Sequence, residues 1–289
     1  MTQNSAAAPA VRPLTGRTGR RRHNAWTVRL CAAILVLVVA VAVLAPWITP
    51  YDPYLADFGS LWLPPSPDHW LGTDQLGRDM LSRLIAGARQ TMLGAIALLA
   101  LATVVGVTVG ITAAWQRGWV DAVLGRVTDV MFAFPGLLFV ILVIAVFDSG
   151  TGTAVVGMAL AYAPAIARFT RAVALDELAR PYIASYRLQG AGGLVICVRY
   201  LLPNMVSTLL GYLVVLFGEG LMSLAALNFI GFGAQPPSAD WGLMVAEARN
   251  GVIQGYLGPA LVPGLTIAVV VVATNVVGLH LSDKLAVRK

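Results

Sequence analysis

Six predominantly apolar runs, each long enough to cross a lipid bilayer as a helix, dominate the sequence. A bilayer core about 30 Å thick is crossed by roughly 17 to 25 residues of helix. The runs cover about Leu30–Ile48, Met92–Trp115, Met131–Phe147, Thr153–Phe169, Val206–Ile230 and Gly258–Leu281. We therefore predict an all-α, polytopic integral membrane protein with six transmembrane helices.

The composition excludes a water-soluble fold and several kinds of chemistry. Hydrophobic residues make up 58% of the 289 residues and charged residues only 12%, about half of the charged share of soluble domains. The only two lysines, Lys284 and Lys289, lie at the C-terminal end, so none follows a glycine-rich turn as an ATP-binding P-loop requires. The two cysteines and three histidines lack the spacing of a metal site. We expect no catalytic residue, cofactor or metal site, and no enzyme activity.

Basic residues are distributed unevenly between the segments that join the runs. Arginine and lysine near the ends of membrane spans favour the cytoplasmic side. If the N-terminus is cytoplasmic, 16 of the 20 basic residues fall in cytoplasmic segments, and only Arg78, Arg83, Arg89 and Arg249 fall outside. We predict that both termini are cytoplasmic. The net charge of +6 then reflects topology rather than nucleic-acid binding.

The runs and loops divide the chain into three parts. Residues 1–29 are basic, lack an apolar pattern and are predicted to form a disordered cytoplasmic tail. Residues 30–90 hold the first transmembrane helix, which is too long for the apolar core of a signal peptide, and an extracytoplasmic segment. Residues 91–285 are predicted to form a core of five transmembrane helices with a cytoplasmic loop at 170–203.

The first extracytoplasmic segment contains a patterned stretch after a proline-rich start. It reads His69-Trp70-Leu71-Gly72-Thr73-Asp74-Gln75-Leu76-Gly77-Arg78-Asp79. Thr73 or Asp74 suits the N-cap of a helix. The apolar residues from Met80 to Ala88 recur at helical spacing, which predicts a surface helix leading into the second run.

The second extracytoplasmic segment, residues 231–257, is rich in glycine and proline. It begins Gly231-Phe232-Gly233-Ala234-Gln235-Pro236-Pro237-Ser238 and continues to Asp240-Trp241-Gly242. These residue types form turns, and tryptophan is enriched where a membrane meets water. We predict a re-entrant or surface hairpin with Trp241 at the membrane interface.

The cytoplasmic loop at 170–203 is the longest internal loop and contains a short predicted helix. Pro181 suits its first turn, and Gly190, Gly192 and Gly193 suit its end. Tyr182, Ile183 and Tyr186 would share one face. An exposed aromatic and aliphatic face is typical of a helix that inserts into the groove of a partner protein. The alternative is a helix that lies flat on the lipid surface.

Together these stretches resemble the C-type membrane subunit of ATP-binding-cassette importers for dipeptides and oligopeptides, a family that includes nickel importers. The resemblance covers about residues 47–285. Its extracytoplasmic motif comprises Gly72, Thr73, Asp74, Gly77, Arg78, Asp79, Gln235, Pro236, Pro237, Trp241 and Gly242. The cytoplasmic loop resembles the permease signature of such importers, with Gly190, Leu202 and Pro203 in register, although Ala184-Ser185-Tyr186 stands where the family has Glu-Ala-Ala.

The resemblance implies a type I importer permease fold in a bacterial cytoplasmic membrane. The chain would form half of a pathway for peptides, or alternatively for nickel or another small solute. Its implied partners are a second related permease, two cytoplasmic ATPase subunits, an extracytoplasmic solute-binding protein and the lipid bilayer. The implied ATPase-coupling loop comprises Tyr182, Ile183, Ala184, Ser185, Tyr186, Gly190, Leu202 and Pro203.

Glu219 and Asn228 are polar residues within the fifth run. Similar permeases often have a glutamate at the position of Leu224, so Leu224 departs from the family pattern; this chain instead has Glu219, five residues earlier. Glu219 either lines the pathway, pairs with the partner permease or is hydrogen-bonded between helices; Asn228 is a second candidate for a pathway or interhelical contact.

Two rival classes fit the sequence less well. A secondary transporter binds its coupling ions through ionisable residues at membrane depth, and only Glu219 qualifies. An intramembrane protease would need a catalytic motif, and neither Gly-x-Ser-x-Gly nor His-Glu-x-x-His occurs.

Overall fold

The computed structural model describes residues 25–287, and within that range the only β pairing is an isolated bridge between Thr73 and Asp79. The long helices are α1 (Ala25–Ile48), α2 (Met80–Gln116), α5 (Thr151–Leu178), α8 (Leu202–Phe229) and α11 (Gly258–Val287). The shorter ones are α3 (Gly118–Ala133), α4 (Gly136–Phe147), α6 (Pro181–Leu188), α7 (Gly193–Val195), the π-helical turn η1 (Ile196–Leu201), α9 (Trp241–Glu247) and α10 (Arg249–Ile253).

The prediction of an all-α membrane protein is confirmed. Five helices are long and apolar enough to cross a membrane, and the number is six if the bent pair α3 and α4 forms one span. The fifth of the predicted runs belongs to a continuous helix that contains α7, η1 and α8, from Gly193 to Phe229. Residues 1–24 of the predicted tail (1–29) lie outside the described residues. Its last five residues, 25–29, form the start of α1.

The predicted helix that leads into the second run is present, but it does not lie on the surface, because Met80, Arg83 and Ala88 are buried. Residues Met80 to Ala88 are the first turns of α2, which continues unbroken for 37 residues. The N-cap is neither Thr73 nor Asp74 but Asp79, whose carboxylate accepts a hydrogen bond from the Ser82 amide at 2.7 Å. At 1.5 Å per residue, α2 is about 55 Å long and must extend beyond the hydrocarbon core.

The third predicted run, Met131–Phe147, is not one straight helix. The chain breaks between α3 and α4, which meet at an angle of 91°. Proline has no amide hydrogen to donate and disfavours helical geometry in the residue before it. Phe134 is accordingly extended, and Pro135 precedes the first residue of α4.

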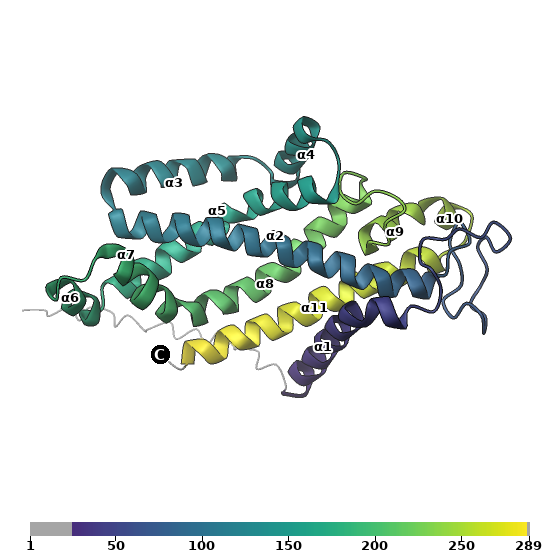
Figure 1. Cartoon of the computed structure of the whole chain (residues 1–289), viewed down its shortest axis with the longest axis horizontal. Coiled ribbons are helices and arrows are strands. Elements are labelled where there is room, and N and C mark those ends of the chain that lie inside the picture. Colours follow the sequence, from purple (N-terminus) through teal and green to yellow (C-terminus); the bar gives the residue numbers. More distant parts are fainter. Residues whose placement is uncertain (1–24, 288–289) are drawn as a thin grey trace, which may run out of the picture.

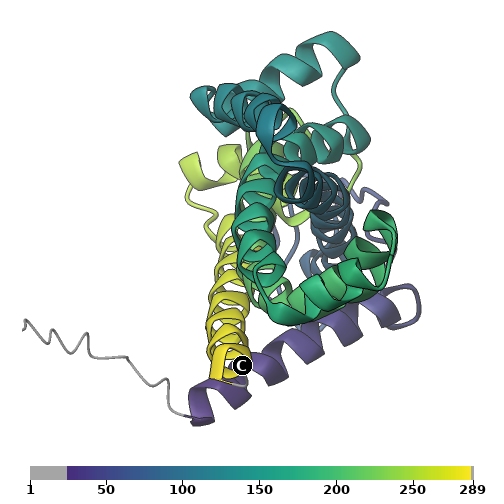
Figure 2. The ribbon, with the colours of Figure 1, turned by 90° about the vertical axis from the view of Figure 1, so that its left-hand side faces the viewer.

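Close packing of α2 against α5 forms the centre of the bundle (Figures 1 and 2). A Cβ atom on Gly106 would lie 2.8 Å from the Ala163 carbonyl oxygen, and one on Gly110 would lie 2.6 Å from that of Ala167. The two backbones are therefore in direct contact, as small residues allow in lipid. α8 and α11 pack beside this pair, whereas α1 runs across the edge of the bundle (Figure 2).

A cluster of buried charges joins the segment before α2 to α2 and α9. We call Asp74, Arg78, Arg83 and Glu247 the charged cluster. Arg78 pairs with Asp74 at 2.7 Å and with Glu247 at 2.8 Å, and Arg83 pairs with the same Glu247 oxygen at 2.6 Å. Both arginine side chains are 1% exposed. Two buried cations thus face two carboxylates, which balances their charge.

A second polar network connects α2, α8 and α9 beside the charged cluster. Asp240 accepts hydrogen bonds from Thr91 and Asn228, both at 2.8 Å, and caps α9 through the Gly242 amide. Trp241 is 1% exposed, and its indole nitrogen donates to the Leu84 carbonyl oxygen at 2.9 Å. Trp241 is therefore packed inside the protein, whereas the prediction had it exposed to a membrane interface.

The remaining residues of the predicted extracytoplasmic motif shape the chain around these networks. Gly72 and Gly77 have φ angles of +76° and +74°, which favour glycine. The Thr73 hydroxyl accepts a hydrogen bond from the Leu63 amide. Gln235, Pro236 and Pro237 lie in an exposed turn, where Gln235 donates to the Gly231 carbonyl oxygen.

Loss of the shared carboxylate in the charged cluster should destabilise the protein. Glu247→Gln leaves two buried guanidinium groups facing Asp74 alone, and removing one partner of a buried ion pair costs about 3–5 kcal/mol. The thermal unfolding midpoint in detergent should fall. Asp68→Asn alters an exposed acid in the same region and should leave the midpoint unchanged. Equal midpoints for the two variants would contradict the structural role of the cluster.

Candidate functional site

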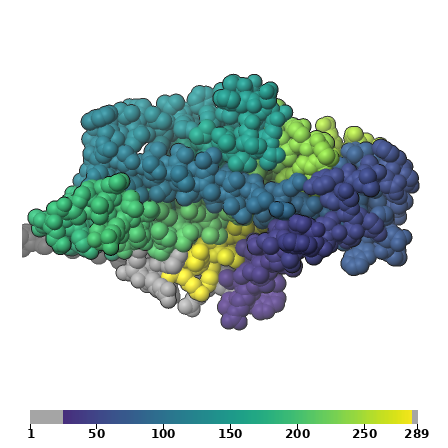
Figure 3. Space-filling model, viewed as in Figure 1, coloured from purple at the N-terminus to yellow at the C-terminus, as the bar shows by residue number. Residues whose placement is uncertain are grey.

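The helix α6 and the turn after it form a projection at the end of the bundle opposite the charged cluster (Figures 1 and 3). Pro181 occupies the first turn of α6, where its missing amide hydrogen costs nothing. Gly190 ends the turn with a φ of +79°, a conformation that other residues rarely adopt. The chain then returns through α7 and η1 into α8, which begins with Leu202 and Pro203.

One face of α6 is packed against the bundle. Ile183 is buried in an apolar cluster with Ala174, Leu201 and Met205. Tyr182 and Tyr186 pack beside the same cluster, and the Tyr186 ring stacks on Tyr200 with centroids 3.8 Å apart. Sequence reasoning grouped Tyr182, Ile183 and Tyr186 correctly on one face. The expectation that this face is exposed for a partner is wrong, because it forms the contact with the bundle.

The opposite face of α6 is exposed, and its side chains are small apart from that of one leucine. Pro181, Ala184, Ser185 and Leu188 follow helical spacing and are all exposed. Leu188 is 90% exposed, and Leu194, just beyond the Gly190 turn, is 79% exposed. We call Ala184, Ser185, Leu188 and Leu194 the outer patch. Such exposed leucines at the end of a projection are typical of a protein contact or a lipid contact.

The joint between α5 and α6 contains a buried acid that sequence reasoning missed. Glu177 is 4% exposed; its carboxylate accepts a hydrogen bond from the Tyr182 hydroxyl at 2.8 Å and pairs with Arg180 at 3.0 Å. Burial and this carboxylate raise the pKa of Tyr182 to about 12, so its hydroxyl remains a hydrogen-bond donor to Glu177 well into the alkaline range. The available signal was an acid in the last turn of a helix, where the helix dipole disfavours negative charge.

A third contact joins α6 to the end of α2. The guanidinium of Arg187 lies 4.6 Å from the ring centroid of Trp115, within the range of a cation–π interaction. Gly193 packs against the same ring, where a Cβ atom would lie 2.8 Å from it. α6 is therefore attached to α2 and α5 as well as to the start of the α8 helix.

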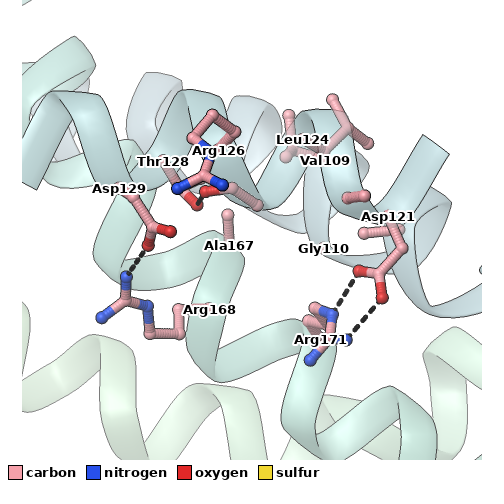
Figure 4. Close-up of a pocket in the computed structure, with 13 residues that line it drawn as sticks. Val109, Gly110, Asp121, Leu124, Arg126, Thr128, Asp129, Ala167, Arg168 and Arg171 are labelled. Atoms are coloured by element: carbon pink, nitrogen blue, oxygen red, sulfur yellow. Dashed lines mark hydrogen bonds and ion pairs between the residues drawn. The ribbon is translucent and has the colours of Figure 1, made fainter. Parts of the chain in front are cut away.

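A pocket of about 530 Å³, lined by both charged and apolar residues, lies between α2, α3 and α5 (Figure 4). Two ion pairs cross it from α3 to α5: Asp129 with Arg168 at 2.7 Å, and Asp121 with Arg171 through two hydrogen bonds. No residue of α3 is buried. Partly exposed pairs contribute little stability each, so α3 is held less firmly than the central helices. Sequence reasoning did not anticipate these pairs.

Glu219 and Asn228 have different surroundings on α8. Asn228 is 1% exposed and bonds to Asp240 and to the Ala234 amide, so its contacts join helix and loop within the chain. Glu219 is exposed on the surface of α8. That position favours the pathway or a partner subunit over an interhelical contact inside this chain.

Comparison with known proteins agrees with this architecture. Residues 106–287 match the family described as binding-protein-dependent transport system inner membrane component. Residues 26–65 match the N-terminal TM domain of oligopeptide transport permease C. In a solved structure of the MetNI methionine ABC transporter in an inward-facing conformation, one chain has the same fold. It has a TM-score of 0.59 and 16% identity, covering 71% of this chain and 97% of that one.

Two full-length relatives are permease proteins of glutathione transport systems. GsiD of Escherichia coli O6:K15:H31 (strain 536) is 36% identical over 290 residues, covering 96% of this chain and 94% of the relative. GsiD of Pectobacterium atrosepticum is 36% identical over 288 residues, covering 97% and 95%. This chain therefore belongs to the family of binding-protein-dependent transport-system inner-membrane components, as a permease subunit of a peptide-type ATP-binding-cassette importer.

Proposed function

We propose that this chain and a second, related permease together form the pathway of an importer for short peptides. Membership of the family implies a membrane complex with ATPase and solute-binding partners. The observation that carries the substrate class is the 36% identity, over nearly the whole chain, to permeases of glutathione transport systems. Glutathione is a tripeptide, which favours peptides over nickel as the cargo.

Glu219 is the residue of this chain that we propose to face the cargo. It lies in the middle of the membrane-spanning part of α8 and is exposed. A carboxylate at that depth is costly unless it faces water or an opposite charge. The α-ammonium group of a peptide is a cation of the right kind, and contact with it would favour peptide over an uncharged solute.

The cargo assay combines these two proposals. The complete importer in proteoliposomes, with its binding protein, is tested with radiolabelled glutathione, dialanine, trialanine and nickel. We expect ATP-dependent uptake of at least one peptide, and Glu219→Gln should raise its half-saturating concentration about tenfold through loss of a charged hydrogen bond. Glu219→Asp, which keeps the charge, is the control. Uptake of nickel but of none of the peptides would contradict the proposed cargo. An unchanged half-saturating concentration in Glu219→Gln would contradict the proposed contact between Glu219 and the cargo.

We propose that the α6 end of the bundle faces the cytoplasm and that both termini lie there. This orientation places 16 of the 20 basic residues in cytoplasmic segments, which supports it because arginine and lysine near membrane spans favour the cytoplasmic side. α6 and the segment before α2 lie at opposite ends of the long axis (Figure 1). The charged cluster then lies on the extracytoplasmic side.

The orientation predicts which exposed positions an impermeant thiol reagent reaches in intact cells. Asp68→Cys and Gln189→Cys are each introduced after Cys31 and Cys197 have been replaced by serine. Both positions are exposed. Asp68 belongs to the segment before α2 and Gln189 caps the end of α6, and these two segments lie at opposite ends of the bundle (Figure 1). Asp68→Cys should react in intact cells, and Gln189→Cys only after permeabilisation. The reverse pattern would overturn the orientation.

We propose that the outer patch of α6 docks on a cytoplasmic ATPase subunit. The small side chains of Ala184 and Ser185 allow close approach, and Leu188 provides an apolar side chain that can enter a groove. The sequence contains no P-loop lysine of its own, so force must reach the bundle from another subunit. The α6 projection is attached to α2, α5 and the α8 helix, which suits that transfer.

A charge placed on the outer patch should break the docking. Leu188→Asp would place a carboxylate in an apolar groove, so the ATPase should co-purify poorly or ATP hydrolysis should no longer drive uptake. Burial of one leucine side chain contributes about 1.5–3 kcal/mol, so the ATPase affinity should fall at least tenfold. Leu55→Asp, which changes a leucine of similar exposure at the other end, is the control. Normal coupling in Leu188→Asp would contradict the docking site.

A further inference from the structure

One buried carboxylate spans the joint between α5 and α6. Glu177 belongs to the last turn of α5, and its two oxygens contact Tyr182 and Arg180 respectively. These partners lie on either side of Pro181, the first residue of α6. We call these contacts the Glu177 bridge. Ala179 and Arg180, which lie between the helices, are both exposed.

The Glu177 bridge stabilises a carboxylate at a position that is otherwise unfavourable for negative charge. A helix C-terminus disfavours a carboxylate, and burial of an ionised group is costly unless it is paired. The neighbouring Asp176 lies in the same helical turn but avoids the cost of burial because it is exposed, whereas Glu177 is buried. Hydrogen bonding to Tyr182 and pairing with Arg180 therefore offset the free-energy cost of burying the Glu177 carboxylate. Loss of these contacts should change the geometry of the joint between α5 and α6.

Tyr182 extends the bridge to the start of α8. Its hydroxyl donates to Glu177 and also lies 3.3 Å from the side-chain nitrogen of Asn204, which donates to the Tyr200 carbonyl oxygen at 2.7 Å. Tyr186 packs edge-on against the Tyr182 ring, with centroids 6.3 Å apart. Through Tyr182, a single hydrogen-bonded network joins the end of α5, the inner face of α6 and the first turn of α8.

We infer that Glu177 is a positioning residue for energy coupling: it fixes α6 relative to α5 and α8, so that displacement of α6 moves all three helices together. The inference rests on the proposed docking of α6 on the ATPase. Without the bridge, Ile183, Tyr186 and Arg187 would still attach α6 to the bundle, but its angle to α5 would be held less firmly and the joint would absorb part of the displacement. ATP hydrolysis would then continue while less peptide is moved for each ATP.

The test measures the number of peptides taken up per ATP hydrolysed by the complete reconstituted importer. The probe is the peptide transported fastest in the cargo assay. Glu177→Gln keeps the shape of the side chain but presents an amide nitrogen to Arg180 or Tyr182, so we expect the ratio to fall about tenfold. The half-saturating peptide concentration should not change, because the Glu177 carboxylate is buried and already paired within the chain. Asp176→Asn makes the same chemical change one residue away and should keep the wild-type ratio.

The outcomes separate this inference from the docking proposal. If Leu188→Asp lowers the ratio but Glu177→Gln matches Asp176→Asn, the inference is wrong and docking stands. If Leu188→Asp has no effect on assembly or on the ratio, the docking proposal itself fails. Should Glu177→Gln not assemble, Tyr182→Phe decides: it keeps the ring packing, and removal of one hydrogen bond should lower the ratio about threefold. A wild-type ratio in Tyr182→Phe would then overturn the inference.

Discussion

The fold depends on the pairing of Arg78 and Arg83 with Asp74 and Glu247 inside the protein. Both guanidinium groups are buried, and Glu247 contacts each of them. Unpaired, such charges would oppose folding; paired, they attach the segment before α2 and the short helix α9 to the start of α2. The adjacent Asp240 network continues this attachment to α8. One end of the bundle is thereby held as a unit, and large movements are more easily accommodated elsewhere.

At the α6 end of the bundle, α2, α5 and α6 are firmly attached to one another, whereas α3 is loosely attached. α2 and α5 touch along their backbones at Gly106 and Gly110, so movement of one is transmitted directly to the other. α6 is attached to this pair through Trp115 and Glu177. α3, by contrast, borders the pocket crossed by two ion pairs and has no buried residue. In the proposed mechanism, force enters at α6 and passes into the central helices, while the end with the charged cluster stays fixed.

The sequence indicates the spans and the turn at Gly190 because these follow from local rules of length and backbone geometry. The break at Pro135 does not follow from local rules alone, because proline does not interrupt every apolar helix. Pro46, Pro164 and Pro263 lie inside α1, α5 and α11. The burial of Trp241 and the inward direction of Tyr182 and Tyr186 cannot be predicted from the sequence, because they depend on contacts with residues distant in the chain. Glu177 was overlooked for a related reason: its importance follows from its burial, which periodicity alone does not reveal.

The central claim is that this chain has no motor of its own and moves peptide only within a larger complex. Purification from native membranes under mild conditions, followed by determination of subunit composition and uptake, tests it most directly. The account predicts one copy of this chain with one related permease and two ATPase subunits, and peptide uptake that requires ATP. Recovery of this chain without those partners, with uptake driven by an ion gradient in the absence of ATP, would contradict it.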